Sequence, residues 1–335
     1  MRITIEHNKV VKREVHEPAY GFDLALQWDE NEWKGWFADA VRRVDRYDIR
    51  DSRREVFLST LEIINQGWGY VTTEGNYVNL KLDDELTQST KFYAKEIHPV
   101  PLYEERYATE VFAVKCDCLT FAREERKGQD DVCVLNMASR QNPGGGVING
   151  AGAQEEYLFR CSDYYRSLYQ YADFAPQYGL PRSPFHSYPL DRNFGGCFST
   201  GVTVFRATEE EGYRLLNHPW RANFIAVPGM NRPDILISGG EERVAPYHIE
   251  GVKNKMRTIF RIAVDNGQKV LVLGALGCGA FRNPPKHTAE LFKDVLEEEE
   301  FSGVFKRVIF AIKEDHNSRG SGNYQPFADV FNGGR

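Results

Sequence analysis

The sequence predicts an α/β fold in which helices cover both faces of a central sheet, and two observations support this prediction. Beyond about residue 101 the chain alternates between short apolar runs and amphipathic helical patterns, which is typical of three-layer α/β/α domains. Each run is rich in Val, Ile and Leu, as in strands buried on both faces of a sheet. The runs are VFAVKC from Val111, VCVLNMA from Val132, FIAVP from Phe224, VLVLGAL from Val270 and RVIFAI from Arg307. In such sheets ligands bind at the carboxyl ends of the strands.

Three segments between these runs have apolar residues at helical spacing and are predicted to be helices. They span residues 154–171, 252–267 and 287–299. The second ends at Gly267, a residue type that favours a helix C-terminus. The acidic run from Leu296 to Phe301 is interpreted as the solvated end of the third helix.

The N-terminal part has a different character. Residues 1–50 are rich in charged and aromatic side chains, including Trp28, Trp33 and Trp36. We interpret these aromatic residues as a packed or partner-binding face, with a ligand platform as the alternative.

A helix is predicted over residues 51–66, with Gly67 as its end, and is followed by a hairpin that turns at Glu74 and Gly75. The chain is therefore divided along its length into three parts. These are an N-terminal extension of residues 1–50, an accessory helix and hairpin segment of residues 51–110, and a catalytic core of residues 111–335.

Composition limits the classes of function. The chain has 335 residues, of which 41% are hydrophobic, and a formal net charge of −6, so it has no global basic field that would attract nucleic acid or an acidic membrane. No apolar run has the length of a signal-peptide core or of a membrane span. The six cysteines form no C-x-x-C pair and no dense disulfide framework. We therefore expect a cytoplasmic protein with reduced thiols.

Two glycine-rich loops follow predicted strands. One contains Gly144, Gly145 and Gly146, and the other contains Gly274, Gly277 and Gly279. Backbone amides of such loops can converge on an anion, so two loops on neighbouring strands could hold a diphosphate and its attached sugar. The Walker pattern and the G-x-G-x-x-G pattern are both absent, which argues against a nucleoside triphosphatase and a Rossmann dinucleotide site. Simple tight turns remain the alternative.

Two adjacent carboxylates, Glu155 and Glu156, come shortly after the triplet, in the first turn of a predicted helix. Neighbouring helical residues point about 100° apart, so one carboxylate could face a ligand while the other holds it from the side. Acidic residues also favour helix N-termini for electrostatic reasons alone, and this remains the alternative interpretation.

Taken together, NPGGGVINGAGAQEE, from Asn142 to Glu156, resembles the signature of poly(ADP-ribose) glycohydrolases: a glycine triplet, a short spacer and Gln-Glu-Glu. The motifs VLNMASRQNPGGG, VTVFRA, FIAVPGMN, VLGALGCGAFRNPP and FKRVIFAI stand in the order found in the compact, bacterial-type branch of that family. The resemblance covers roughly residues 50–335. It implies a macrodomain fold with a mixed central sheet and a mainly helical N-terminal accessory region.

The resemblance also implies roles for individual residues. Glu156 would be the catalytic acid and then base, and Glu155 would orient the ribose on the departing side. Gln154 would support the helix start. The implied ADP-ribose contacts are Gly144, Gly145, Gly146 and Val147 at the distal ribose and phosphate, Gly277, Cys278, Gly279 and Ala280 at the diphosphate, Phe281 at the terminal ribose, Asn231 at a ribose and Asp117 at the adenine amine.

The activity implied is hydrolysis of ribose–ribose bonds in ADP-ribose polymers, with ADP-ribose as the product. Such hydrolysis needs an acid for the leaving oxygen and stabilisation of positive charge at the anomeric carbon. We expect no metal and no cofactor, because His186, His218, His248 and His287 are isolated in the sequence. The expected partner is an ADP-ribose polymer or an ADP-ribosylated macromolecule, without sequence-specific nucleic-acid binding, and we expect a monomer. A mono-ADP-ribosyl hydrolase and an ADP-ribose-binding reader module remain alternatives.

Overall fold

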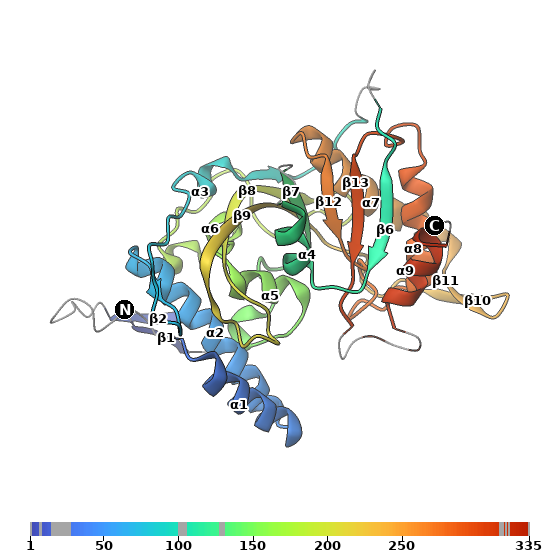
Figure 1. The fold of residues 1–335 in the computed structure, drawn as a ribbon. Coiled ribbons are helices and arrows are strands. Elements are labelled where there is room, and N and C mark those ends of the chain that lie inside the picture. Colours follow the sequence, from blue (N-terminus) through green and yellow to red (C-terminus); the bar gives the residue numbers. More distant parts are fainter. Residues whose placement is uncertain are drawn as a thin grey trace. The chain divides into compact units, whose positions relative to one another are not determined.

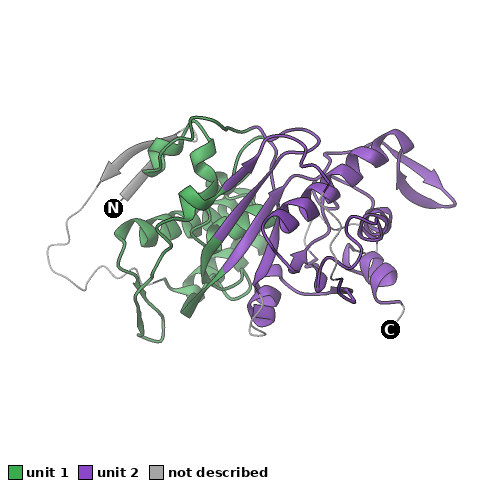
Figure 2. Cartoon of the chain, turned by 90° about the horizontal axis from the view of Figure 1, so that it is seen from above, with its two compact units in different colours: residues 1–90, 141–188, 201–221 green, residues 91–140, 189–200, 222–335 purple. Residues whose placement is uncertain are grey.

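The computed structural model describes residues 2–6, 9–14, 28–99, 106–126, 131–314, 318, 320 and 322–333 (Figure 1). The chain forms two compact units, each built from several segments (Figure 2). Unit 1 comprises residues 1–90, 141–188 and 201–221, and unit 2 comprises residues 91–140, 189–200 and 222–335. The three parts predicted along the chain are continuous, whereas the two compact units interleave in sequence.

Unit 1 is mainly helical. An antiparallel hairpin pairs β1 (Arg2–Glu6) with β2 (Lys9–Glu14), and a second pairs β3 (Tyr70–Val71) with β4 (Tyr77–Val78). The helices are α1 (Glu30–Arg42), α2 (Arg46–Gln66), α3 (Leu86–Ser89), α5 (Gln154–Cys161) and α6 (Tyr165–Leu168), with 3₁₀ helices η2 (Val147–Asn149), η3 (Tyr169–Tyr171) and η4 (Ala175–Tyr178).

The predicted accessory helix and hairpin are both present in unit 1. Helix α2 begins after Asp45, whose side chain accepts hydrogen bonds from the Tyr47 and Asp48 amides, and it ends at Gly67 with φ of 75°. An acidic N-cap and a left-handed glycine are the signals that stop a helix at each end. The Glu74–Gly75 turn is closed by a 2.8 Å hydrogen bond from the Gly75 amide to the Thr72 carbonyl.

Two of the N-terminal tryptophans pack within unit 1. The Trp33 indole is buried and donates to the Ser52 carbonyl at 2.8 Å. The Trp28 indole donates to the Gly212 carbonyl at 2.7 Å, and the Arg206 guanidinium lies 4.6 Å from the centre of its ring. The burial of Trp33 and the partial burial of Trp28 fit the packed-face interpretation, whereas Trp36 is exposed.

The single helix predicted over residues 154–171 is wrong, because the chain breaks after α5. Ser162 is extended, with φ of −149°, and forms an isolated bridge with Val204. The Asp163 carboxylate accepts the Thr203 amide at 2.7 Å, and the Asp163 amide donates to the Thr203 carbonyl at 3.1 Å. These tertiary hydrogen bonds replace the helical ones, and α6 and η3 follow as separate short helices.

The central sheet has seven strands in the order β5-β8-β9-β7-β12-β13-β6. β9, β7, β12, β13 and β6 pair in parallel, while β5 pairs antiparallel with β8. The sheet is therefore mixed, as predicted. The strands are β5 (Lys91–Tyr93), β6 (Glu110–Val114), β7 (Val132–Met137), β8 (Gly196–Arg206), β9 (Leu215–Val227), β12 (Val270–Leu273) and β13 (Arg307–Ala311). The boundary between the units crosses β8 and β9.

Four helices and a third hairpin complete the described part of unit 2. They are α4 (Cys118–Glu125), α7 (Pro246–Asp265), α8 (Pro285–Leu296) and α9 (Tyr324–Phe331), with β10 (Ile235–Ser238) paired to β11 (Glu241–Val244). Phe260 of α7 and Phe292 of α8 are buried in one apolar cluster with Phe310 of β13. The Asn332 side chain pairs with both the amide and the carbonyl of Ala113, at 2.9 Å each, and so satisfies part of the edge strand β6.

The acidic run after α8 is more than a solvated helix end, which corrects that interpretation. Glu298 accepts two hydrogen bonds from Arg257 at 2.8 Å, and Glu300 accepts two from Arg261 at 2.8 and 2.9 Å. The run therefore also anchors α7 to the end of α8 through bidentate ion pairs. Among the described residues, none of the helices has both the length and the apolar character required to cross a bilayer.

Candidate active site

The glycine triplet forms a tight turn in the segment that follows β7. Gly144 and Gly145 have φ of 76° and 55°, in the left-handed region that glycine adopts without a Cβ clash. The Gly145 amide donates to the Asn142 carbonyl and the Val147 amide donates to the Gly144 carbonyl, both at 3.1 Å. One turn of η2 then leads towards α5.

The triplet's other two amides bind the paired glutamates. The Gly144 amide donates to Glu155 Oε1 at 3.1 Å, and the Gly146 amide donates to Glu156 Oε1 at 2.8 Å. Both glutamates lie in the first turn of α5, which begins at Gln154, and are only 3% and 7% exposed. The anion that these amides hold is therefore the protein's own pair of carboxylates, which the sequence did not indicate.

A side chain at Gly144 or Gly145 would displace the residues packed against this turn. A Cβ on Gly145 would lie 2.4 Å from Glu156 Oε1 and 3.1 Å from Glu155 Oε2. A Cβ on Gly144 would lie 2.8 Å from the ring of Phe159. The interpretation of the triplet as a simple turn is therefore incomplete, because the glycines also let the backbone approach the carboxylates closely.

Glu156 has one anchored oxygen and one oxygen without a partner. Its Oε2 atom is buried and makes no hydrogen bond to any residue within the described ranges. An unsatisfied buried oxygen is costly and uncommon in folded proteins. One fixed and one available oxygen is the arrangement that a positioned general acid requires.

The spacer between the triplet and α5 lies against helix α2. A Cβ on Gly150 would meet the Arg50 carbonyl oxygen at 1.8 Å, and one on Gly152 would meet the Arg53 guanidinium at 2.2 Å. These two glycines therefore allow the backbone of the spacer to contact α2 directly. The accessory helix is part of the structure that holds the segment between the glycine triplet and α5.

A buried polar network fixes the same spacer. Arg160, on α5, donates to the Ala151 carbonyl at 2.7 Å and to the Tyr213 hydroxyl at 2.8 Å. The Tyr213 hydroxyl donates to Glu209 at 2.8 Å, and Arg53 binds both oxygens of Glu209 at 2.8 Å. Burial alone would raise the pKa of Glu209, but the hydrogen bond and charge of Arg53, the charge of Arg160 and the Tyr213 hydroxyl together outweigh it, and the pKa is lowered. The lowered pKa favours the ionised form of Glu209, which Arg53 and Arg160 stabilise.

The second glycine loop, after β12, belongs to unit 2. Gly277 has φ of 76°, and a Cβ on it would lie 2.5 Å from Asn283 Nδ2. The Asn283 amide group donates to the Met230 carbonyl at 2.7 Å and to the Gly277 carbonyl at 3.1 Å. β12 pairs directly with β7 in parallel register, so the strands that precede the two loops are neighbours, as predicted.

The amides of this second loop differ from those of the triplet. The backbone N–H groups of Gly277, Gly279, Ala280 and Phe281 donate no hydrogen bond to any residue that the structure describes. Consecutive unpaired amides in a turn form a concave donor set suited to a phosphate. The second loop therefore retains the anion-binding capacity that the triplet uses for Glu155 and Glu156.

Three further residues predicted to contact ADP-ribose are Cys278, Asn231 and Asp117, and each has a different environment. Burial raises the pKa of the Cys278 thiol to about 12, and the side chain is only 4% exposed, which argues against a role as nucleophile. Asn231 is exposed in the segment after β9. The Asp117 carboxylate accepts the Leu119 and Thr120 amides at 3.0 and 2.9 Å as the N-cap of α4.

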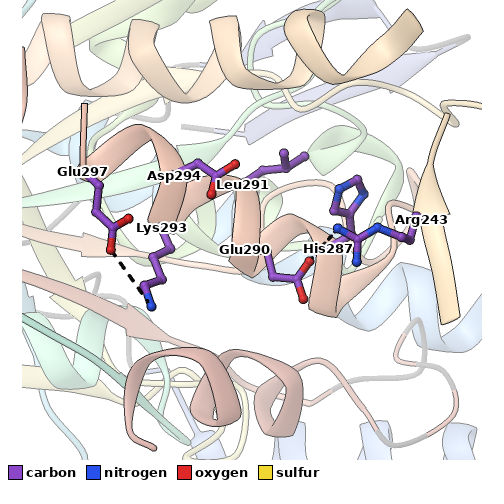
Figure 3. A pocket seen from close by; sticks show the side chains of 7 residues that line it. All are labelled: Arg243, His287, Glu290, Leu291, Lys293, Asp294 and Glu297. Atoms are coloured by element: carbon purple, nitrogen blue, oxygen red, sulfur yellow. Dashed lines mark ion pairs between the residues drawn. The ribbon is translucent and has the colours of Figure 1, made fainter. Parts of the chain in front are cut away.

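Metal ligands and pockets are two further features that could indicate a site among the described residues. Within the described ranges no group of three or more His, Cys, Asp and Glu side chains could hold a metal ion. A pocket of about 320 Å³ on α8 contains none of the predicted site residues (Figure 3). It is crossed by the Arg243–Glu290 ion pair at 2.8 Å. Its lining residues are Arg243, His287, Glu290, Leu291, Lys293, Asp294 and Glu297.

Comparison with known proteins identifies the family. The family model described as "Microbial-type PARG, catalytic domain" matches residues 58–207. A poly(ADP-ribose) glycohydrolase from Thermomonospora curvata, solved with the inhibitor ADP-HPD, is 30% identical, with a TM-score of 0.64 over 84% of this chain and 100% of that one. This chain belongs to the microbial-type poly(ADP-ribose) glycohydrolase family.

A second bacterial family member supports the same assignment. The poly(ADP-ribose) glycohydrolase from Deinococcus radiodurans, solved in complex with ADP-ribose, is 27% identical, with a TM-score of 0.57 over 76% of this chain and 99% of that one. No match was found among curated proteins. The predicted family, its α/β fold and its classification as a glycohydrolase are confirmed.

In this glycohydrolase, the residues that sequence reasoning missed are those that hold the spacer before the glutamates. Tyr213, Glu209 and Arg53 lie far from the motif in sequence, and only the fold connects them. The signal that could have indicated them is the pair of glycines in the spacer, Gly150 and Gly152, since small residues at fixed positions mark a close backbone approach.

Proposed function

We propose that this chain hydrolyses the ribose–ribose glycosidic bonds of ADP-ribose polymers and releases ADP-ribose, with Glu156 as the catalytic acid and base. The observation that carries this proposal is the Glu156 carboxylate itself. Its Oε1 is held by the Gly146 amide at 2.8 Å, and its Oε2 is buried without a partner among the described residues.

The reaction follows from this arrangement. Protonated Glu156 Oε2 donates its proton to the bridging oxygen as the C–O bond breaks, and positive charge develops at the anomeric carbon. The carboxylate then accepts a proton from the attacking water, whose oxygen forms the new C–O bond, and the acid is regenerated. Since Oε1 stays bound to the loop, the side chain keeps one orientation through both steps, which lowers the entropic part of the barrier.

The remaining roles concern the binding of the substrate. We assign Glu155 to orienting the ribose on the departing side. We assign the unpaired amides of the second loop to the diphosphate, since they are donors without acceptors within the described chain. We assign the triplet to lining the substrate with its backbone and to positioning the two glutamates that its amides bind. Val147 and Gln154 beside the triplet, the backbone of Cys278, and Phe281, Asn231 and Asp117 complete the proposed ADP-ribose contacts.

The test compares wild type with the Glu156→Gln variant. Glutamine keeps the Oε1 acceptor for the Gly146 amide but carries no transferable acid proton, so the loop should be retained. We expect polymer hydrolysis to fall by about 10³-fold or more, as for loss of an acid and base that acts in both steps. Affinity for ADP-ribose, measured by calorimetry, should stay within about threefold.

The substrates in this assay separate the alternatives. Labelled poly(ADP-ribose) should be converted to ADP-ribose by wild type and left intact by the variant. Turnover of a mono-ADP-ribosylated protein with an untouched polymer would instead indicate a mono-ADP-ribosyl hydrolase. Tight ADP-ribose binding without turnover of either substrate would indicate a reader module, and an active Glu156→Gln variant would exclude Glu156 as the acid.

A further inference from the structure

Two arginines beside the second glycine loop have an unusual backbone conformation. Arg232 and Arg282 have φ of 50° and 58°, in the left-handed region that residues with a Cβ rarely adopt. Such outliers persist where the surrounding structure fixes them, and they concentrate at functional sites. Arg232 directly follows Asn231, and Arg282 directly follows Phe281, so each comes next to a residue that we assign to the ligand.

The loops that carry the two arginines are joined to each other. The Arg232 amide donates to the Phe281 carbonyl at 2.8 Å, and the Asn283 side chain donates to the Met230 carbonyl at 2.7 Å. A Cβ on Gly229 would lie 3.2 Å from the Gly277 Cα, so the two backbones are also in close contact. The backbones at the two arginines are therefore fixed relative to one another.

Neither guanidinium is neutralised. Both arginines are exposed, and neither forms an ion pair with a residue inside the described ranges. The nearest acid in sequence to Arg232 is Asp234, which accepts the Tyr247 hydroxyl at 2.7 Å and lies 3.3 Å from His248 Nε2. In a chain with a net charge of −6, two exposed, unpaired arginines on loops that are joined to each other supply local positive charge that can attract an anion.

We propose that Arg232 and Arg282 form a second anion subsite, which binds a diphosphate of the polymer outside the ADP-ribose unit held by the Gly277–Phe281 loop. This proposal rests on the proposed function. An ADP-ribose polymer carries a diphosphate in every unit, so a neighbouring unit presents the same group again. Guanidinium groups bind phosphate oxygens in a bidentate manner, and the fixed backbone reduces the entropy lost on binding.

The subsite predicts that affinity depends on chain length. A polymer occupies both the amide loop and the arginine pair, whereas free ADP-ribose occupies the loop alone, so the polymer should bind more tightly. The extra affinity should weaken with salt, because contacts between arginine and phosphate are ionic. Two binding elements on one ligand add affinity when the linker spans them.

The test measures binding in the Glu156→Gln background, in which the polymer stays intact. We expect the added change Arg232→Gln/Arg282→Gln to weaken polymer binding by about tenfold, to leave ADP-ribose affinity unchanged, and to reduce the salt dependence of polymer binding. The control Arg46→Gln/Arg54→Gln removes two exposed positive charges from α2 and should leave polymer affinity within about twofold. The Arg232→Lys/Arg282→Lys change keeps the charge and should give an intermediate affinity.

The possible results are distinct. Polymer affinity equal to that of the control would overturn the proposal, and so would an equal loss of ADP-ribose affinity, which would place the arginines at the first unit. If the Arg232→Gln/Arg282→Gln change lowers the melting temperature, the Arg232→Lys/Arg282→Lys variant decides the test. The proposal then requires that this variant bind polymer less tightly than the protein with both arginines, and equal affinity would overturn it. Absence of polymer turnover in wild type would refute the proposed function, and the ratio of polymer to ADP-ribose affinity would still test the subsite.

Discussion

Replacing Gly145 with alanine tests whether the triplet positions the catalytic carboxylate. The new Cβ would lie 2.4 Å from Glu156 Oε1 and 3.1 Å from Glu155 Oε2. Ordinary van der Waals contact lies near 3.4 Å or beyond, so the Glu156 carboxylate must move by about 1 Å. That movement breaks or lengthens the 2.8 Å hydrogen bond from the Gly146 amide.

The Gly145→Ala substitution should affect both the stability of the fold and the rate of catalysis. Alanine at φ of 55° is strained by roughly 1–2 kcal/mol, which corresponds to a melting temperature lower by a few degrees. A catalytic group misplaced by about 1 Å can lose about 10²-fold in rate. We therefore expect kcat/KM for polymer to fall by about 10²-fold while the protein remains folded.

Gly267→Ala provides the matched control. Gly267 has φ of 66°, and a Cβ on it would meet no atom within 4 Å, so the substitution introduces the same backbone strain without a steric clash. Both variants should show a similar loss of stability in thermal denaturation, and only Gly145→Ala should lose activity in the polymer assay. Activity of Gly145→Ala within about threefold of the Gly267→Ala control would refute the reasoning that the glycine places Glu156.

Two further predictions concern the structure around this loop. Arg53→Met should lower the free energy of unfolding by about 3 kcal/mol or more, because Glu209 would keep a largely buried charge without its bidentate partner; adding Glu209→Gln should recover most of the loss in chemical denaturation. Burial raises the pKa of Asp163 to about 6, above the value of about 3.9 in unfolded chains. The folded state therefore holds this proton more firmly, and the free energy of unfolding should fall by up to about 3 kcal/mol as pH rises from about 4 to 6. Asp163→Asn should lack this dependence, and identical pH profiles for variant and wild type would contradict it.

Local patterns predicted the elements whose signals lie close together in sequence. The parallel strands β7, β12 and β13 were visible as apolar runs, because a strand buried on both faces must be apolar at every position. Helix α2 was visible from its apolar spacing and from Gly67. In contrast, the break after α5 depends on hydrogen bonds between Asp163 and Thr203, and helical spacing alone cannot indicate a partner forty residues away.

The candidate site also has features that local sequence predicts and features that depend on tertiary contacts. By itself, the sequence determined the family and the residue types, because a glycine triplet followed by Gln-Glu-Glu within one short segment is specific enough to identify. It also predicted both glycine loops and the glutamate expected to act as acid. These are properties of contiguous residues, for which chain order and chemistry are sufficient.

Only the tertiary structure decided what each loop binds. The two glycine loops are similar in sequence character. The Gly144 and Gly146 amides of the triplet bind Glu155 and Glu156, whereas the amides of Gly277, Gly279, Ala280 and Phe281 are unpaired within the described chain. Every residue except proline has the same backbone N–H donor. The partner of that N–H therefore depends on which acceptor the fold brings within about 3 Å. The support of the segment between the triplet and α5 by α2 and by Glu209 likewise comes from distant parts of the chain, and close packing in three dimensions determined it.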